Sequence, residues 1–309
     1  MTEATRLSAG QHHRPFYALG LRLLAMAALA IMFASVKWLG EHGVHLVESI
    51  FYRQLLALPV PIAAMMMGEG LSMIRTARPG AHFGRAYVGL IGMVFNFGAV
   101  ILLPLAEATT IGFTVPIFAT ILSVIFLGER PGIHRWLAVL TGFLGVVLIV
   151  GAQGHLDLPW IGFIVALTAA LVTSCVSLLL RQIGKTEHPT TTVFYFSLLT
   201  LPPLGLAMLH FGQTHSLITW AVILLMGISG GLAQLFMTGA LRWGPVSLVL
   251  PMDYSALVWS TLLGWLLWRQ WPGPGTWAGA AVIAGSSLYI VWREHVRHRE
   301  ISSRGVSVS

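Results

Sequence analysis

The most restrictive feature of this chain is that it contains one sequence unit twice. Residues 51–65 return 143 positions later with eight identities, which in the first copy are Phe51, Tyr52, Leu55, Leu56, Leu58, Pro59, Ala64 and Met65. A second match, at an offset of 141, relates positions between Pro104 and Val150 to positions between Pro245 and Val291. Since the two matches reach across both halves, the whole unit is duplicated, which in an apolar chain is typical of transporters.

Composition places the chain in a membrane. Hydrophobic residues make up 56% of the 309 positions and charged residues only 9%, with a mean hydropathy of +0.80, whereas roughly a quarter of a soluble domain is charged. About 20 apolar residues cross a bilayer, and we predict ten spans: 17–39, 46–67, 86–106, 108–128, 136–156, 158–180, two within 188–241, 245–268 and 270–292. Pro202-Pro203 and the segment from His210 to His215 are expected to divide the run 188–241. The predicted fold class is an all-α integral membrane protein with ten transmembrane helices.

The repeat also predicts the topology. The second copy starts five spans after the first, and because five is odd it is inverted in the membrane, giving two inverted five-helix repeats. We expect repeats at 17–151 and 159–292, a periplasmic linker at 152–158, an N-terminal arm at 1–16 and a C-terminal tail at 293–309. Fifteen of the 18 Lys and Arg residues lie on the side of the termini, which the positive-inside rule assigns to the cytoplasm. The first span lacks a small-x-small cleavage pattern and is expected to remain uncleaved.

Several patterns that suggest other chemistry are explained by this topology. The net charge of +7 is spread over six segments and does not indicate a nucleic-acid partner. The stretch Gly227 to Gly231 fits the G-x-S-x-G pattern of hydrolases. It lies in an apolar helical run, however, where glycines four residues apart favour close packing of a neighbouring helix. The spacing of His and Cys shows no metal-ligand pattern, and no cofactor is predicted.

Two charges lie deep inside predicted spans. Arg53 is about eight residues into the second span, roughly 12 Å below the surface at 1.5 Å per residue, and Asp253 reaches a similar depth in the ninth span from the opposite side. A charge at this depth costs about 2.5–3.5 kcal/mol on insertion scales, so it should face a wet cavity or a partner. We expect both residues to face a central cavity. They either bind opposite ends of a substrate or form a structural pair, and the sequence leaves both roles open.

Uncharged residues complete the candidate site. Asn96 and Gln234 are amides in the middle of spans three and eight, and they should point inward because an unpaired polar group is costly in lipid. Aromatic residues that could form walls of the cavity are Phe113, Phe118, Tyr254 and Trp259. The predicted substrate-binding residues are Arg53, Asp253, Asn96, Gln234, Tyr254 and Phe113.

Other polar residues and prolines are given structural roles. Lys37 and Glu48 lie nearer the outer ends of spans one and two, where Lys37 can snorkel and Glu48 can help to cap its helix. Glu107 is expected at the interfacial turn between spans three and four. Pro116 and Pro251 each remove a backbone donor, so we expect bends in spans four and nine, where a binding site and a gate would lie.

Three motifs connect the chain with a known family. They are Lys37-Trp38-Leu39 at the end of span one, Phe51-Tyr52-Arg53 in span two, and Phe126-Leu127-Gly128-Glu129-Arg130-Pro131 after span four. With the ten spans arranged as 5+5, residues 17–292 resemble the EamA branch of the drug/metabolite transporter superfamily. The second copy departs from the third motif, because Gln270 stands where the first copy has Glu129.

The resemblance implies a carrier in the bacterial inner membrane, whose members move amino acids, nucleosides, vitamins, S-adenosylmethionine or toxic organic compounds. We therefore expect a secondary transporter of a small organic metabolite that works by alternating access, with export slightly favoured over uptake. The expected partners are a small-molecule substrate and the lipid bilayer; proton coupling and a homodimer are left open. The alternative is a membrane-embedded enzyme acting on a lipid-linked substrate, which the sequence disfavours because Asp253 is the only deep acid.

Overall fold

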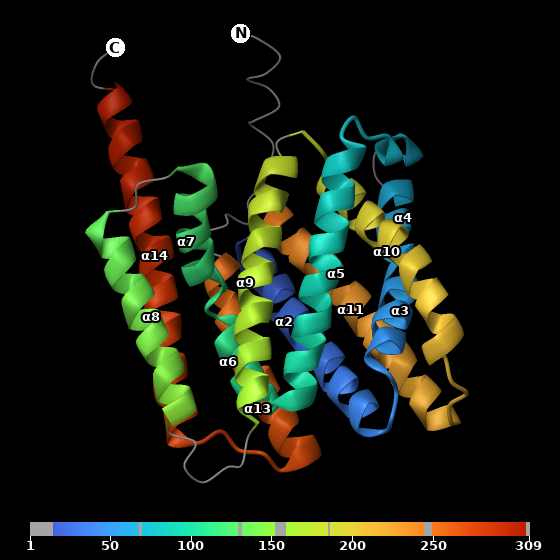
Figure 1. Ribbon diagram of the computed structural model, residues 1–309. Coiled ribbons are helices and arrows are strands. Elements are labelled where there is room, and N and C mark those ends of the chain that lie inside the picture. Colours follow the sequence, from blue (N-terminus) through green and yellow to red (C-terminus); the bar gives the residue numbers. More distant parts are fainter. Residues whose placement is uncertain are drawn as a thin grey trace.

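The computed structural model describes residues 15–67, 70–128, 132–151, 159–184, 186–243 and 249–306. Within these residues the chain forms helices joined by short connections and no strand, and Figure 1 shows the helices gathered into one bundle. The predicted all-α class is confirmed. The predicted linker 152–158, residues 1–14 of the predicted N-terminal arm, and Glu129 lie outside the described residues.

The helices follow one another along the chain in two groups. The first group consists of α2 (Pro15–Glu41), α3 (Leu46–Ala57), α4 (Pro59–Met67), the 3-10 helix η1 (Leu71–Ile74), α5 (Pro79–Leu102), α6 (Leu105–Gly112), α7 (Val115–Leu127) and α8 (Ile133–Gly151). The second consists of α9 (Trp160–Ile183), α10 (Pro189–Phe211), α11 (Leu217–Trp243), the 3-10 helix η2 (Leu250–Tyr254), α13 (Ser255–Trp268) and α14 (Pro274–Val306).

Seven helical segments of the described residues are long and apolar enough to cross a membrane. They are Phe16–Glu41, Leu46–Met67, Pro79–Leu102, Leu105–Phe126, Trp160–Ile183, Pro189–Phe211 and Leu217–Ala240. The other predicted spans, 136–156, 245–268 and 270–292, correspond to α8, to η2 with α13, and to α14, which lie in the same bundle (Figure 1). The chain is a multi-pass membrane protein, and ten crossings stay a prediction.

Prolines lie where two of the spans are interrupted. α6 ends at Gly112 and Pro116 occupies the first turn of α7, while Pro251 lies in the first turn of η2, ahead of α13. The first turn tolerates proline because its N–H groups have no partner within the helix. The interruptions expected at Pro116 and Pro251 are therefore present.

The run 188–241 is divided at one of the two features expected to divide it. α10 continues through Pro202-Pro203, because membrane helices tolerate proline when neighbouring groups satisfy the freed backbone, and it ends at Phe211, within the predicted segment from His210 to His215. The predicted start of the third span is wrong. α5 begins at Pro79 rather than at residue 86. The prediction required a charge-free run, whereas His82 and Arg85 lie within α5 and are only 1% and 8% exposed.

Three pairs of helices make the most extensive contacts: α2 with α11, α5 with α9, and α8 with α14. Figure 1 shows α8 and α14 side by side at one edge of the bundle. A Cβ atom on Gly145 would lie 3.0 Å from the carbonyl oxygen of Gly279, and one on Gly279 would lie 2.5 Å from that of Gly145. Glycine at both positions therefore allows the two backbones to approach closely.

The glycines of the G-x-S-x-G stretch have the packing role expected of them. A Cβ atom on Gly231 would lie 2.8 Å from Cγ2 of Val60, and one on Gly227 would collide with Leu56. α11 thus lies close to α3 and α4 at these two positions, and the stretch belongs to a helix rather than to a strand-to-helix turn.

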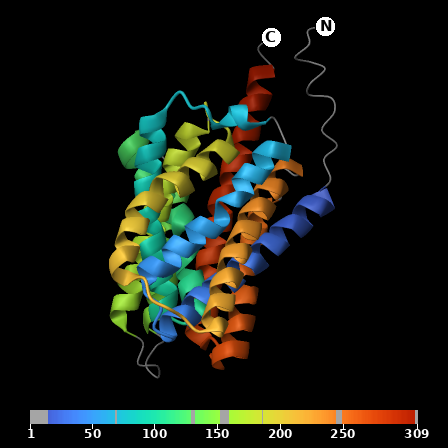
Figure 2. The ribbon, with the colours of Figure 1, turned by 90° about the vertical axis from the view of Figure 1, so that its right-hand side faces the viewer.

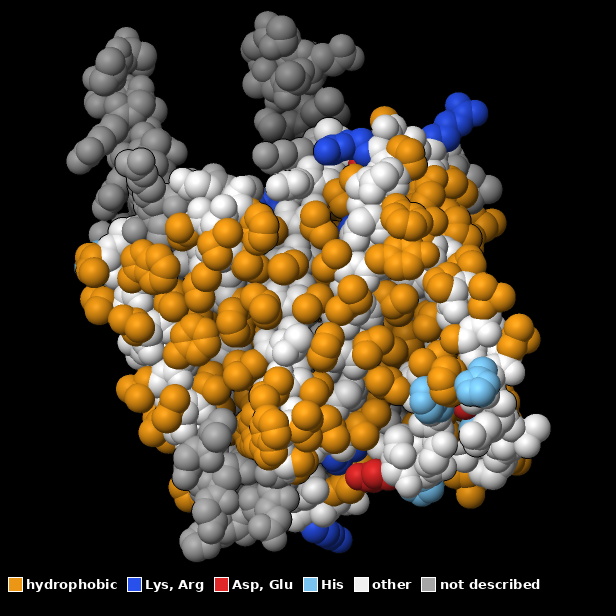
Figure 3. All heavy atoms as spheres, viewed as in Figure 1, with side chains coloured by type: hydrophobic (Ala, Val, Ile, Leu, Met, Phe, Trp, Pro, Cys, Tyr) orange, Lys and Arg blue, Asp and Glu red, His pale blue; other side chains and the backbone are white. Residues whose placement is uncertain are grey.

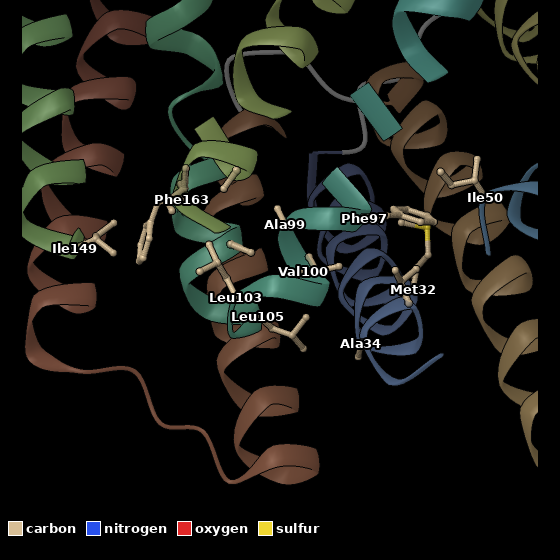
Figure 4. Close-up of a cluster of buried hydrophobic side chains, with 14 of the residues drawn as sticks. Met32, Ala34, Ile50, Phe97, Ala99, Val100, Leu103, Leu105, Ile149 and Phe163 are labelled. Carbon is tan, nitrogen blue, oxygen red and sulfur yellow. The ribbon is translucent and has the colours of Figure 1, made fainter. Parts of the chain in front are cut away.

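The buried core lies where helices of the first group meet those around them. Phe97 of α5, Met32 of α2 and Ile50 of α3 are between 1% and 3% exposed, and Figure 4 shows Phe97 and Met32 pointing toward one another. In lipid, dispersion contacts of this kind hold helices together, since lipid tails are as apolar as the side chains.

The surface agrees with a membrane environment. Figure 3 shows hydrophobic side chains over most of one face, with charged side chains mainly toward its two ends. Leu140, Leu144 and Val147 on α8 are each more than half exposed, as expected for residues that face lipid. Figure 2 shows that the first residues of α2 and the last residues of α14 lie toward the same end of the bundle.

Candidate functional site

A cavity of about 470 Å³ lies inside the bundle. Its wall is built from α2 to α7 of the first group and from α9, α10, α11, η2 and α13 of the second. This volume falls within the range of small-molecule sites, and the mostly apolar lining with a few polar groups is typical of them. The polar side chains of the lining are Arg53, Arg85, Asn96, Thr109, Thr173, Ser197, Gln234, Asp253 and Ser260.

Most of the predicted site residues lie at this cavity. Its lining includes Arg53, Asp253, Asn96, Gln234 and Phe113. Tyr254 is not part of the lining, but its ring packs edge-on against Phe113 with 4.8 Å between the ring centroids. The structure therefore brings the six residues together, and their contact with a substrate stays a prediction.

Asp253 pairs with Arg22 and not with Arg53. Its two carboxylate oxygens accept hydrogen bonds from Nε and Nη2 of Arg22 at 2.5 and 2.7 Å. The side chain of Arg22 is 4% exposed and that of Asp253 is 35% exposed. The alternative in which Arg53 and Asp253 form a direct structural pair is thus wrong. Arg22 escaped prediction because it lies near the start of the first span and was assigned to the cytoplasmic edge.

Arg53 is held by an amide that is itself fixed by the second group of helices. Its Nη1 donates to Oε1 of Gln54 at 2.5 Å, and Nε2 of Gln54 donates to Oγ1 of Thr200 in α10 at 2.7 Å. Gln54 is completely buried. Nε of Arg53 is also buried and has no hydrogen-bond partner among the described residues, so the guanidinium group keeps an unused donor beside the cavity.

The face of α5 that lines the cavity carries a residue that was not predicted. Arg85, Gly89, Gly92 and Asn96 follow at intervals of four, three and four residues, so they share one face of the helix. All four line the cavity. This stripe of polar and small residues is the signal that could have identified Arg85, which was instead counted among the cytoplasmic charges.

Polar contacts at the cavity also cross between the two groups of helices. Nδ2 of Asn96 in α5 donates to Oγ1 of Thr173 in α9 at 3.1 Å. The hydroxyl groups of Thr109 in α6 and Ser260 in α13 are 2.8 Å apart. The cavity therefore lies at a seam where both groups contribute hydrogen-bonding side chains.

Two of the four candidate aromatic residues lie elsewhere. Trp259 packs against the cluster of Ala25, Met26 and Ala256, and Phe118 packs edge-on against Phe143 with 5.5 Å between the centroids. Neither belongs to the lining of the cavity. Both are packing residues, which is the commoner role of aromatic side chains in helices.

Lys37 was expected to extend toward the membrane surface, but its side chain is buried. It is 4% exposed, and its Nζ donates to the carbonyl oxygens of Val100 and Leu103 at 3.3 and 3.0 Å, where α5 ends. A cation at a helix C-terminus satisfies carbonyl groups that have no partner in the helix. Lys37 therefore ties the end of α2 to the end of α5.

Glu48 lies in the first turn of α3, as expected, but His45 is the residue that caps this helix through its side chain. Oε1 of Glu48 lies 2.7 Å from Nε2 of His215, in the connection between α10 and α11. Glu107 likewise lies in the first turn of α6, where it accepts a hydrogen bond from Thr276 at 3.0 Å. Both acids are buried and join distant parts of the chain.

The family model of the EamA-like transporter family matches residues 16–151 and, a second time, residues 160–292. A riboflavin transporter of Rhizobium johnstonii is 32% identical over 75% of this chain and 76% of its own length, and a riboflavin transporter of Vibrio cholerae is 30% identical over 74% and 76%. The pseudopaline exporter CntI of Pseudomonas aeruginosa is 29% identical over 85% and 92%.

Similarity extends to an uptake protein and to a solved structure. An S-adenosylmethionine uptake transporter of Rickettsia bellii is 24% identical over 89% of this chain and 94% of its own length. A solved crystal structure aligns with 88% of this chain over 94% of its own length. The TM-score of this alignment is 0.58 and the sequence identity is 24%. This last likeness shows a shared fold.

Proposed function

The chain belongs to the EamA-like transporter family, and from this premise we propose that it is a secondary carrier that moves a small organic metabolite by alternating access at the cavity. Its relatives are named as transporters and not as enzymes. The alternative of an enzyme acting on a lipid-linked substrate is therefore set aside.

One observation carries the proposal. The cavity is lined by residues from both segments that match the family model, among them Asn96 from the first and Gln234 from the second. A site shared by two units can open to one side or the other when the units rock against each other. The interruptions at Pro116 and Pro251 lie beside the same cavity, where a hinge would be most effective.

The packing of the helices supports a repeat of five spans, which we propose is inverted and gives ten crossings. If spans one to five correspond to spans six to ten, the contact of α2 with α11 must be repeated by that of α9 with α5. These are two of the three most extensive contacts in the bundle. The third joins α8 to α14, the fifth and tenth spans, which a two-fold axis in the membrane plane would exchange.

The proposal includes the setting of the carrier. We place it in the bacterial inner membrane with both termini in the cytoplasm, because most Lys and Arg residues fall on that side of the predicted topology. Export is slightly favoured over uptake. The relatives include proteins named for each direction, so the direction has to be measured.

Flux measurements test the proposal. The purified protein in proteoliposomes should transport radiolabelled riboflavin, S-adenosylmethionine or a metabolite that accumulates in a deletion strain, because the first two are cargo of its relatives. Carrier flux saturates with substrate and is stimulated by substrate on the opposite side. Linear flux without such stimulation indicates a channel, and chemical conversion of the substrate indicates an enzyme.

Two further measurements extend this test to coupling and oligomeric state. A proton gradient imposed across the proteoliposomes should drive uphill accumulation if transport is proton-coupled, and an ionophore should abolish it. The mass of the protein in detergent, measured by light scattering, distinguishes a monomer from a homodimer.

A further inference from the structure

Two arginines face the cavity without a neutralising acid. We propose that Arg53 and Arg85 form an anion-binding subsite, and that the cargo is a small organic anion whose carboxylate or phosphate group lies between the two guanidinium groups. The assignment of cargo rests on the proposed carrier function, whereas binding of an anion at the two arginines can be tested by itself.

The charge balance of the cavity is the first argument. Asp253 is the only acid among the described residues of the lining, and both of its oxygens already accept hydrogen bonds from Arg22. Within the described part of the chain, no carboxylate lies within 4.0 Å of Arg53 or Arg85. The cavity wall therefore presents two positive charges that no carboxylate of the described residues balances at salt-bridge distance.

Unused hydrogen-bond donors are the second argument. Nε of Arg53 and both Nε and Nη1 of Arg85 are buried and have no partner among the described residues. Arg85 as a whole is 8% exposed. Buried donors of this kind are normally satisfied, and a guanidinium group in a membrane is costly unless it has a partner.

The two side chains are also positioned to act together. Both arginine side chains line the same cavity, Arg53 from α3 and Arg85 from α5. Arg53 is oriented by Gln54, and Cζ of Arg85 lies 3.9 Å from the centroid of the Phe196 ring. Like charges held close together are stabilised by an anion between them, and the planar guanidinium group matches carboxylate and phosphate oxygens.

Glycine at position 89 makes room for this arrangement. A Cβ atom on Gly89 would lie 2.9 Å from Cε2 of Phe196 and 3.1 Å from Nη1 of Arg85. A larger residue would therefore displace the ring or the guanidinium group. The close approach of α5 to α10 at Gly89 therefore leaves room for Arg85 to lie against Phe196 in the lining of the cavity.

The rest of the lining describes the body of the anion. Phe33, Phe97 and Phe113 line the cavity together with methionine and alanine side chains, while Asn96 and Gln234 supply single polar contacts. An aromatic or apolar body with one acidic group matches this surface.

The test uses three probes that share a naphthalene body and carry a negative, a neutral or a positive group. Naphthalene-2-carboxylate, naphthalene-2-carboxamide and 2-(aminomethyl)naphthalene are titrated against the purified full-length protein in detergent, and binding is measured by the shift in melting temperature and by equilibrium dialysis. We expect the carboxylate to bind about tenfold more tightly than the amide, because hydrogen bonds to a charged group are stronger than those to a neutral one and a tenfold change in affinity corresponds to about 1.4 kcal/mol. We expect the amine to bind most weakly.

Variants assign the preference to the two arginines. Arg53→Gln and Arg85→Met each remove the preference for the carboxylate while binding of the amide stays unchanged, and Arg85→Met keeps an apolar stem against Phe196. Arg78→Gln, which removes an exposed positive charge outside the cavity, leaves all three affinities as in the wild type.

The stability of Arg85→Met without any probe is a second test. We expect this variant to melt at or above the wild-type temperature, because it removes an unpaired buried charge. A purely structural role of Arg85 predicts a lower melting temperature.

Several outcomes overturn the proposal. These are equal binding of the carboxylate and the amide, no detectable binding of the carboxylate at about 10 mM, and a carboxylate preference that survives in both arginine variants. Displacement of the carboxylate by phosphatidylglycerol but not by phosphatidylcholine would assign the site to a lipid headgroup and also overturns it. Absence of flux in proteoliposomes with the anion preference intact overturns the carrier and leaves the anion site standing.

Discussion

Arg22 and Asp253 are joined by two hydrogen bonds of 2.5 and 2.7 Å, although they are 231 positions apart in the sequence. The pair connects α2, the first helix, to η2 at the interruption before α13. It also borders the cavity, since Asp253 belongs to the lining. The contact therefore links the two matched segments beside the site where a cargo is expected.

Removing one partner of this pair should destabilise the protein more than removing both. We expect Arg22→Gln to cost about 2 kcal/mol, less than a fully buried pair because a third of Asp253 remains exposed. Arg22→Gln combined with Asp253→Asn should cost less than the sum of the single changes. Melting temperatures of the three variants in detergent measure this coupling, and strictly additive shifts would show that the pair contributes nothing.

The buried pair of Glu48 and His215 predicts a larger effect. Glu48 is 0% and the His215 side chain 8% exposed, so His215→Ala leaves a carboxylate buried without its partner, at a cost of about 3–5 kcal/mol. His215→Gln, which can still donate a hydrogen bond, should recover part of the loss. The control is His210→Ala, an exposed histidine just before the same connection, and a melting temperature as low for this control as for His215→Ala contradicts the prediction.

The glycine contact between α8 and α14 predicts a steric effect. Gly279→Ala places a Cβ atom 2.5 Å from the carbonyl oxygen of Gly145, so the helices must separate, at a cost of about 1–3 kcal/mol. Gly285→Ala in the same helix is the matched control, because no atom lies within 4 Å of its added Cβ. Thermal unfolding compares the two, and equal melting temperatures would refute the contact.

Stability should depend on pH through Glu187, which lies between α9 and α10. Burial raises the pKa of Glu187, but the hydrogen bond from Thr76, the neighbouring imidazole of His82 and the backbone N–H of Ala77 together hold it below its ordinary value of 4.5. Since the pKa is lower in the folded chain than in the unfolded chain, the carboxylate stabilises the fold above pH 4.5 and this stabilisation is lost as the pH falls through the folded pKa.

The measurement for Glu187 compares the wild type with Glu187→Gln. The difference in melting temperature should be largest near neutral pH and should shrink as the pH falls below 4.5. A difference that stays constant over this range would mean that the charge of Glu187 does not stabilise the fold.

The helical class and the position of Arg53 and Asp253 at a cavity could be predicted because both follow from hydrophobicity along the chain. Arg53 and Asp253 were placed at the cavity for this reason, since a charge deep in a span needs a wet or paired environment. Asn96 and Gln234 were placed there by the same argument. Depth alone, however, does not give the rotation of one helix relative to another, so the partner of Asp253 could not be predicted.

Arg85 was missed because the charge-free run of its span began only at residue 86, and Arg22 was missed because it was counted with the charges on the side of the termini although it lies within the predicted span 17–39. Both lie inside helices and are 3% and 8% exposed, which a hydropathy criterion cannot distinguish from a position at the membrane surface. The spacing of Arg85, Gly89, Gly92 and Asn96 along one face of α5 contains this information, because a helix face is defined by intervals of three and four residues. The burial of Lys37 was missed for a similar reason.

The close seam between α8 and α14 has a practical consequence. Beyond their contact with each other, these two helices contact mainly α6 and α7, and they form one edge of the bundle (Figure 1). Among the residues whose side chains the structure describes, none of either helix lines the cavity. A fluorophore or a fiducial antibody fragment fixed to the outer side of this edge would therefore leave the cavity unobstructed.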